Sequence, residues 1–505
     1  MGRTQNSFKS IVVNVIGQLF QVVVQFASRT IFISVLSAEY LGVHGLFTNI
    51  LSVLSLAELG FGASIIYSMY KPIASENKKE ITGLMNLFRR IFTVVAIIIF
   101  LIGLTLVPFL ESFFAEPVSI ESIRLIYLLY LINTVFSYLL IYKKAIIDAH
   151  QKYYISTFYK KGFIVLQNIL QIIFLILTGN FIVYLLIKIG TDLASNLMIS
   201  RKADALYPYL KENKTILPDK VTRKSIYKNT YAMSIHKLGS VAVNNTDNII
   251  MSSFISIVSV GIYSNYTLIL SNLTVFLALL FNSLTASVGN LGMTSSKLKL
   301  ISTFKTINFI GFWIYSFSAI SLLTLLNPFI SLWVGTEYTF STNIVLILVV
   351  NFYINGMRKV PLTFRDALGL FWYDRFKPVF ETIINLVGSI LLVQVYGIAG
   401  IFWGTFLSAF LVSFWVEPYI LFKHGFDEKI RDYFKQYAFY TSIFIVSGGF
   451  TFYITSLIPD NNWIMFIFKV STIVILYNLL IIAFFFRTTE FKSFVDIIKR
   501  VLLKT

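Results

Sequence analysis

Six ionised side chains stand inside long apolar stretches of the sequence. They are Arg29, Glu58, Lys188, Asp192, Lys237 and Asp247. A charge at mid-membrane depth costs at least about 2.5 kcal/mol, and such a residue normally faces a partner or a water-filled cavity. Guanidinium and ammonium groups held there could bind a phosphate through charge-assisted hydrogen bonds. The pattern therefore predicts a polar site inside a membrane-embedded bundle.

Four of these residues fall at matching depths in two hairpins. Arg29 lies 10 residues from a turn near residue 39, and Asp247 lies 11 residues from a turn near residue 258. Glu58 and Lys237 lie 19 and 21 residues from the same turns, which places them about 10 Å deeper in helices that rise 1.5 Å per residue. We predict that Arg29 meets Asp247, and that Glu58 meets Lys237, across a central cavity. The alternative is that Arg29 snorkels to the interface and the acids pair locally.

Uncharged polar residues mark one face of the first apolar stretch. With steps of 4, 3, 4 and 3 they keep to that face: Asn14, Gln18, Gln21, Gln25 and Ser28. Asn244 adds an amide close to Asp247 in the seventh stretch. Such faces avoid lipid, so they either join helices by hydrogen bonds or line a cavity suited to sugar hydroxyls. Lys188 and Asp192, four residues apart, either pair along one helix face or line the same cavity.

Other chemistry lacks its residues. The chain has no cysteine, and its four histidines are scattered without metal-ligand spacing. The dipeptide Gly-Lys never occurs, so there is no P-loop. We expect no cofactor, no metal and no enzymatic activity. A pump of this kind would draw on a proton or sodium gradient, or on its substrate.

The elements that position these residues are membrane-spanning helices. The chain has 505 residues, of which 56% are hydrophobic and 13% charged, and its apolar runs are long enough to cross a hydrocarbon core about 30 Å thick. Backbone groups in lipid must pair within their own segment, so the runs are helices. We predict fourteen spans: 10–36, 43–70, 86–110, 123–143, 163–179, 181–200, 229–254, 260–288, 303–326, 342–358, 379–396, 398–421, 437–457 and 462–486.

The lysines and arginines set the expected orientation. The odd-numbered connections (37–42, 111–122, 180, 255–259, 327–341, 397 and 458–461) contain no lysine or arginine. By the positive-inside rule these connections lie outside and both termini lie in the cytoplasm. Attraction to an anionic inner leaflet then accounts for the net charge of +18, and we expect membrane lipids but no nucleic acid as partners. The short outer connections leave no room for an external catalytic domain.

The two halves of the chain resemble each other weakly. Residues 29–47 align with 248–266 at an offset of 219, which matches Gly42 with Gly261. Six spans in each half make the repeat parallel, about an axis along the membrane normal. We predict two six-helix lobes, 1–215 and 216–425, with two extra helices in 426–505. Gly400 and Gly404 form a further close-packing motif in the twelfth span.

These residues resemble a known family. Arg29, Leu41-Gly42 and the stretch from Leu56 to Gly62 (LAELGFG) are similar to the opening of bacterial polysaccharide flippases, and Asp247 is similar to an Asp that recurs in their seventh helix. This is the Wzx-type branch of the multidrug/oligosaccharidyl-lipid/polysaccharide exporter superfamily. The resemblance covers essentially the whole chain. One departure is that lipid II flippases cluster several arginines in the cavity, whereas here there are one arginine and one or two lysines.

The resemblance implies transport of a polyprenyl-pyrophosphate-linked oligosaccharide repeat unit to the outer leaflet of the bacterial cytoplasmic membrane, by alternating access of two lobes. It also implies a role in capsule, O-antigen or related polysaccharide assembly, beside a polymerase and glycosyltransferases. Arg29 and Lys237 would then meet the pyrophosphate. The main alternative is a multidrug or cation antiporter of the same fold, which would need an anionic cavity. A membrane polymerase or ligase would need a large external loop, and a passive channel predicts no lobed repeat.

Overall fold

The computed structural model describes residues 3–58, 61–120, 122–211 and 216–502, and these residues form helices and short connections with no β-strand among them. Thirteen helical stretches in this part of the chain are long and apolar enough to cross a membrane. The predicted all-α integral membrane fold is thereby confirmed. The predicted span 229–254 is not among the thirteen, because the helix there carries many polar residues.

The chain divides into two compact units, Met1–Gly261 and Ile262–Thr505. The helices of unit 1 are α1 (Arg3–Val35), α2 (Ala38–Leu54), η1 (Ser55–Glu58), α3 (Phe61–Ala74), α4 (Lys78–Leu106), η2 (Val107–Phe113), α5 (Ile123–Ala149), α6 (Tyr153–Thr178), α7 (Phe181–Leu206), η3 (Pro208–Lys211), α8 (Lys220–Asn245) and α9 (Asp247–Phe254). The first turn of α10 (Ile257–Thr294) also belongs to unit 1.

Unit 2 holds the rest of α10 and the helices that follow it. These are α11 (Lys297–Val334), η4 (Thr336–Tyr338), α12 (Thr342–Met357), α13 (Lys359–Ala367), α14 (Lys377–Tyr396), α15 (Ile398–Ser408), η5 (Ala409–Ser413), α16 (Phe414–Ile420), η6 (Leu421–Phe426), α17 (Arg431–Ser456), α18 (Trp463–Phe485) and α19 (Thr489–Leu502).

Several helices run past their predicted ends into the charged connections. Helix α4 begins at Lys78, eight residues before the predicted start, because the Asn77 side chain caps it by accepting the backbone N–H of Glu80 at 3.1 Å. Likewise α5 continues to Ala149, and α6 begins at Tyr153. Hydropathy marks only the part of a helix that lies in lipid, so it misses turns that continue into water.

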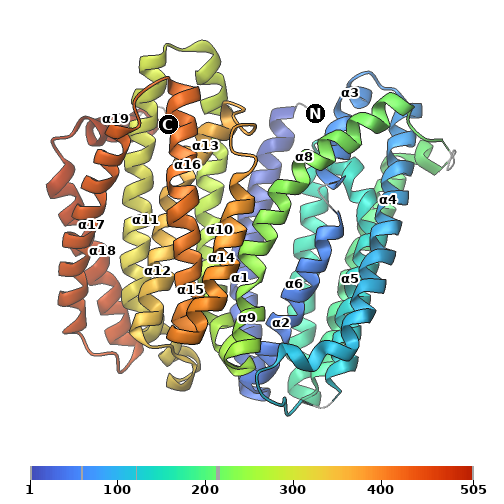
Figure 1. Cartoon of the computed structure of the whole chain (residues 1–505), viewed down its shortest axis with the longest axis horizontal. Coiled ribbons are helices and arrows are strands. Elements are labelled where there is room, and N and C mark those ends of the chain that lie inside the picture. The colour runs from blue at the N-terminus through green and yellow to red at the C-terminus, as the bar shows by residue number, and fades with distance from the viewer. Residues whose placement is uncertain (1–2, 59–60, 121, 212–215, 503–505) are drawn as a thin grey trace. The chain divides into compact units, whose positions relative to one another are not determined.

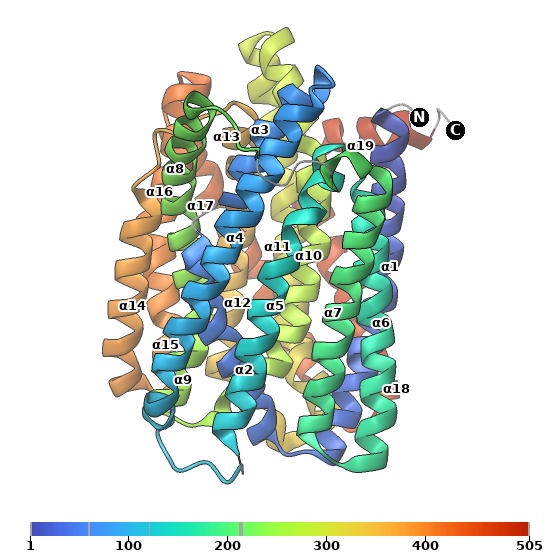
Figure 2. The same cartoon turned by 90° about the vertical axis from the view of Figure 1, so that its right-hand side faces the viewer.

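Within unit 1, α1 packs along α6, and α5 packs against α4 and α7 (Figure 2). At the predicted cytoplasmic end, side chains of α3, α4, α5, α7 and α8 form one apolar core. Its largest buried members are Met69, Met85, Phe88, Phe92, Tyr207 and Ile226. This core fixes the helices that carry the polar residues described below.

Within unit 2, α11 contacts α12, α17 and α18, and the last two helices lie side by side (Figure 1). The α14–α15 pair is especially close. A Cβ atom on Gly400 would lie 2.1 Å from the Leu392 carbonyl oxygen, and one on Gly404 would lie 2.3 Å from Ser389 Oγ. The predicted close-packing role of these two glycines is thereby confirmed.

The division after Gly261 lies beyond the lobe boundary expected from the repeat, because α8 and α9 pack with unit 1. Ser64 of α3 donates a hydrogen bond to the Ile226 carbonyl at 3.2 Å, and Asn86 of α4 donates one to the Ile216 carbonyl at 3.0 Å. The lobes 1–215, 216–425 and 426–505 stay a prediction about which parts of the chain move together.

Candidate functional site

Arg29 lies in the upper half of α1, within electrostatic reach of α2 and α7. It acts on the Tyr184 hydroxyl and on His44, and Lys188 acts on His44 as well. His44 shares a hydrogen bond with the Tyr130 hydroxyl. The structure therefore brings together two of the predicted site residues, Arg29 and Lys188, around a histidine that sequence reasoning did not select.

Lys188 and Asp192 form the ion pair expected from their spacing along α7. Lys188 Nζ lies 3.2 Å from Asp192 Oδ2, and the Asn133 amide of α5 donates to the same oxygen at 3.0 Å. The carboxylate is thus shared between a charged and a neutral donor. The observed pair supports the simpler interpretation of the spacing, although Arg29 and Lys188 still belong to one electrostatic group.

The predicted polar stripe on α1 meets a lysine of α6. Lys161 Nζ donates to Gln18 Oε1 at 2.6 Å and also to Gln21 Oε1. Both acceptors are neutral amide oxygens, so they hold the ammonium group without cancelling its charge. Gln18 and Gln21 are confirmed as interior polar residues, whereas Gln25 stays a prediction.

Lys160, the residue before Lys161, points to the opposite side of α6 from lipid. The exposed apolar positions of α6 lie on one face and include Phe158, Leu166, Ile169, Ile173 and Leu177. Lys160 instead shares a face with Gln167 and Gln171, and it lies within electrostatic reach of Lys144, Lys188 and Asp192. No ion pair joins Lys160 to a carboxylate among the residues that the structure describes.

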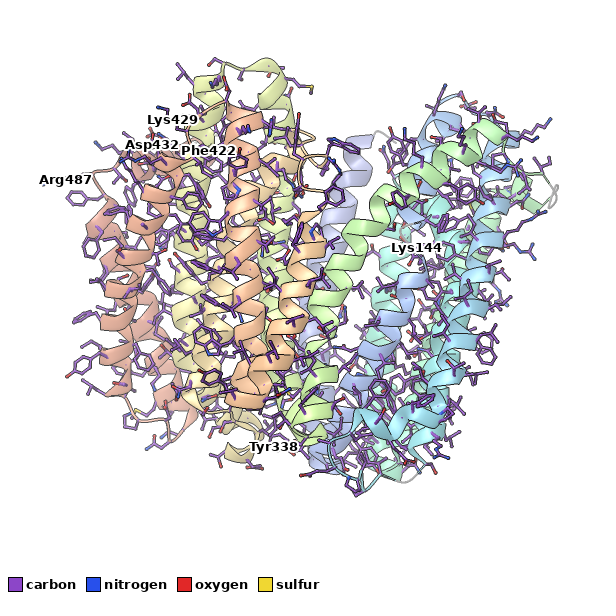
Figure 3. The ribbon with its side chains drawn as sticks, in the orientation of Figure 1. Lys144, Tyr338, Phe422, Lys429, Asp432 and Arg487 are labelled. Carbon is purple, nitrogen blue, oxygen red and sulfur yellow. The ribbon has the colours of Figure 1, made fainter. Side chains whose placement is uncertain are left out.

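These side chains make up what we name the basic cluster. It consists of Arg29, Lys144, Lys160, Lys161 and Lys188 with the carboxylates Asp148 and Asp192. Lys144, labelled in Figure 3, lies 3.5 Å from Asp148, which also accepts a 2.8 Å hydrogen bond from Ser156. Five cations therefore face two carboxylates, and each carboxylate already has its partners. An anion is the ligand that such a group favours.

Sequence reasoning missed Lys144, Lys160 and Lys161 because it placed them in a cytoplasmic connection. The helical step could have found Lys160, since positions 160, 164, 167 and 171 continue the polar face of Gln167 and Gln171 down the helix. His44 carried no such signal.

Glu58 stands where the second predicted span is broken. The short 3-10 turn η1 ends at Glu58, and α3 begins at Phe61. The Tyr138 hydroxyl of α5 donates to Glu58 Oε2 at 3.4 Å. The predicted pairing of Glu58 with Lys237 stays a prediction, because the Lys237 side chain lies outside the described residues, as does that of Asn244.

Asp247 stands at a second break, between α8 and α9. Its Oδ1 atom and the Oδ1 atom of Asn248 are buried, and neither has a hydrogen-bond partner among the described residues. The predicted meeting of Asp247 with Arg29 stays a prediction as well.

Unit 2 contains a separate charged group that sequence reasoning left in a loop. The Arg358 guanidinium donates to both oxygens of Glu417, from Nε at 3.0 Å and from Nη2 at 2.8 Å, and Lys377 donates to the same carboxylate. Arg358 also lies 3.3 Å from Glu381. Two cations and two carboxylates balance here, and Glu417 is fully buried, so this group stabilises unit 2 and offers no free charge to a ligand.

No family model matches the sequence, and no curated protein matches it. Solved structures do. The lipid II flippase MurJ in an inward closed conformation matches with a TM-score of 0.65 and 15% identity, over 94% of this chain and 99% of that chain. A multidrug resistance MATE family transporter of the MOP superfamily, in an inward-facing conformation, gives 0.62 and 15%, over 81% and 98%. A Vibrio cholerae MATE transporter, VcmN, gives 0.54 and 13%, over 84% and 99%.

At such low identity the likeness concerns the fold. The chain has the fold of MOP-superfamily transporters, and the multi-pass membrane architecture predicted from the sequence agrees with theirs.

Proposed function

We propose that this protein is a flippase that moves a polyprenyl-pyrophosphate-linked oligosaccharide repeat unit from the inner to the outer leaflet for cell-surface polysaccharide assembly. The excess of cations in the basic cluster carries the proposal. Lys161 is held by two amide oxygens, and Lys160 has no carboxylate partner in the described part of the chain. A pyrophosphate would supply the anionic oxygens that these two groups lack.

The neutral polar residues around the cluster suit the rest of such a substrate. Gln18, Gln21 and Gln167 present amide groups along α1 and α6, and these can exchange their present partners for sugar hydroxyls. The polyprenyl chain would stay in the bilayer. Arg29 and Lys188, nearer the predicted outer end, would receive the anion as it moves, and Lys237 and Asn244 would join them from α8.

The proposed setting follows from the same reasoning. Both termini face the cytoplasm of a bacterial cell, and glycosyltransferases and a polymerase act before and after this step. A proton or sodium gradient drives the cycle, because the sequence offers no nucleotide-binding motif.

Flipping can be measured directly in reconstituted vesicles. A fluorescent lipid-pyrophosphate oligosaccharide is placed in both leaflets, and its exposure to a membrane-impermeant quencher is followed. We expect the protein to speed the exchange, and the double variant Lys160→Gln/Lys161→Gln to slow it at least about tenfold, the change produced by 1.4 kcal/mol. The matched control is Lys297→Gln/Lys299→Gln, at the exposed start of α11. Equal rates for both double variants would refute the assignment.

One observation favours a second candidate, a multidrug or cation antiporter. Asp247 Oδ1 is a buried carboxylate oxygen without a hydrogen-bond partner in the described chain, and a cation would satisfy it. Export of a cationic dye that disappears in Asp247→Asn, together with no lipid flipping by the wild type, would select the antiporter. Build-up of lipid-linked repeat units on the inner leaflet after gene deletion would select the flippase.

A further inference from the structure

Two glycines meet in a reciprocal crossing at the predicted outer end of unit 1. A Cβ atom on Gly42 of α2 would lie 2.0 Å from the carbonyl oxygen of Ile257, and a Cβ atom on Gly261 of α10 would lie 2.0 Å from the carbonyl oxygen of Ala38. Real Cβ atoms never come so close to another atom, so only glycine fits at either position. The first turns of the two helices are in backbone contact.

The crossing obeys the internal repeat. Gly42 and Gly261 are 219 residues apart, and so are Ala38 and Ile257. Each glycine therefore touches the carbonyl of the residue equivalent to the one its counterpart touches. This is the self-complementary contact that a two-fold axis produces. It joins equivalent helices of the two halves, and the chain divides into its two units directly after Gly261.

Neighbouring contacts close the same end. Ala115, which follows η2, donates its N–H to the Ser252 carbonyl at 2.9 Å, and Ser252 Oγ donates to the Phe113 carbonyl at 2.6 Å. Glu39 of α2 accepts the N–H of Ser119 at 2.8 Å. Figure 1 shows α2 and α9 next to each other where these contacts form. The ends of α2, α9 and α10 are thus held together with the connection between α4 and α5.

We infer that the Gly42–Gly261 crossing is an outer clasp, which is closed in this structure and must part each time the substrate leaves toward the outer leaflet. The contact consists of Cα–H groups against carbonyl oxygens, so parting it exposes no unpaired charge. A contact of this kind suits a closure that opens in every cycle. The inference rests on the proposed transport function but not on the identity of the substrate.

The first test uses solvent access from outside. The chain has no cysteine, so Asn248→Cys, which lies beside Gly45 just below the crossing, is a single reporter for a membrane-impermeant maleimide. We expect Gly42→Ala, and separately Gly261→Ala, to raise the labelling rate at least about tenfold, because the added Cβ holds the helices apart. The controls are Gly162→Ala and Gly190→Ala, whose Cβ atoms meet nothing within 4 Å. Unchanged labelling in correctly folded Gly42→Ala and Gly261→Ala would overturn the clasp.

The second test does not depend on those variants folding. A Cβ atom at position 45 lies 3.2 Å from Val260 Cγ1, so Gly45→Cys/Val260→Cys, without the reporter, has the spacing of a disulfide. Oxidation should stop transport and reduction should restore it. Full transport by the oxidised pair, verified by thiol counting, would overturn the proposal. Labelling does not depend on substrate, so an outer end that opens in a protein that flips no lipid-linked oligosaccharide would reject the proposed function and leave the clasp standing.

Discussion

Glu417 offers the sharpest test of how the charged groups stabilise the protein. Its carboxylate is fully buried and accepts two hydrogen bonds from Arg358 and one from Lys377. Glu417→Gln keeps the size of the side chain and one oxygen, but it points an N–H donor at two cations. Only Glu381 then remains to balance Arg358 and Lys377.

The expected cost follows from the burial of the group. Removing one partner of a buried, hydrogen-bonded ion pair destabilises a protein by about 3–5 kcal/mol, because the remaining charges are left without compensation. The matched control is Glu428→Gln. Glu428 lies 3.5 Å from Lys297, and about half of each side chain is exposed, so this substitution should cost roughly 0–1 kcal/mol.

Unfolding in detergent, followed by tryptophan fluorescence, compares the two variants with the parent protein. Glu417→Gln should lower the free energy of unfolding by several times more than Glu428→Gln. The reasoning also predicts that Arg358→Met/Glu417→Met/Lys377→Met is less destabilised than Glu417→Gln alone, since the triple variant leaves only Glu381 charged. Equal losses for Glu417→Gln and Glu428→Gln would refute the argument.

Three other predictions concern single side chains. Asp192→Asn should increase the affinity for an anionic substrate, because it releases Lys188 from its 3.2 Å ion pair; binding of a lipid pyrophosphate measures this, and weaker binding would contradict it. Burial lowers the pKa of His150, which ends α5 and stacks on Tyr207, so the neutral ring is favoured in the fold and stability should fall as pH drops below about 6.5, the usual pKa of histidine. Thermal melts between pH 7.5 and 5 should show that loss in the wild type and a smaller one in His150→Gln. Gly404→Val should destabilise unit 2 strongly and Gly449→Val little, since a Cβ atom at 404 meets Ser389 at 2.3 Å and one at 449 meets nothing within 4 Å; equal melting temperatures would contradict this.

Hydropathy and helical periodicity were enough to predict the membrane fold. Apolar runs reveal which segments lie in lipid because the bilayer imposes a minimum length, and the Gly400–Gly404 spacing predicted a contact that the structure contains. The ends of the helices could not be found in this way. The additional turns of α4, α5 and α6 lie in water, where an Asn77 cap rather than hydrophobicity decides where a helix begins.

The site was predicted in part for a related reason. Arg29, Gln18 and Gln21 stand out because lipid penalises them, whereas Lys160 and Lys161 look like ordinary residues of a charged connection until α6 is known to begin at Tyr153. Counting depth from a turn gives a level along a helix but no direction around it. For that reason the partner of Lys161 was found only from the packing of α1 on α6.

Ion pairs and glycine contacts occupy opposite ends of the repeat, and this division explains how one chain can be both firm and mobile. Lys143 and Asp204 pair at 2.6 Å in unit 1, and Arg358 and Glu417 pair at 2.8 Å in unit 2, at offsets of 215 and 213 residues. Each pair joins the fourth and sixth spans of its own half at the predicted cytoplasmic end. Parting such a pair would leave charges uncompensated, so each half keeps its shape there. The Gly42–Gly261 contact contains no charge, and it alone joins equivalent positions of the two halves at the other end. Motion should therefore concentrate at the glycine crossing, with both ion pairs intact throughout the cycle.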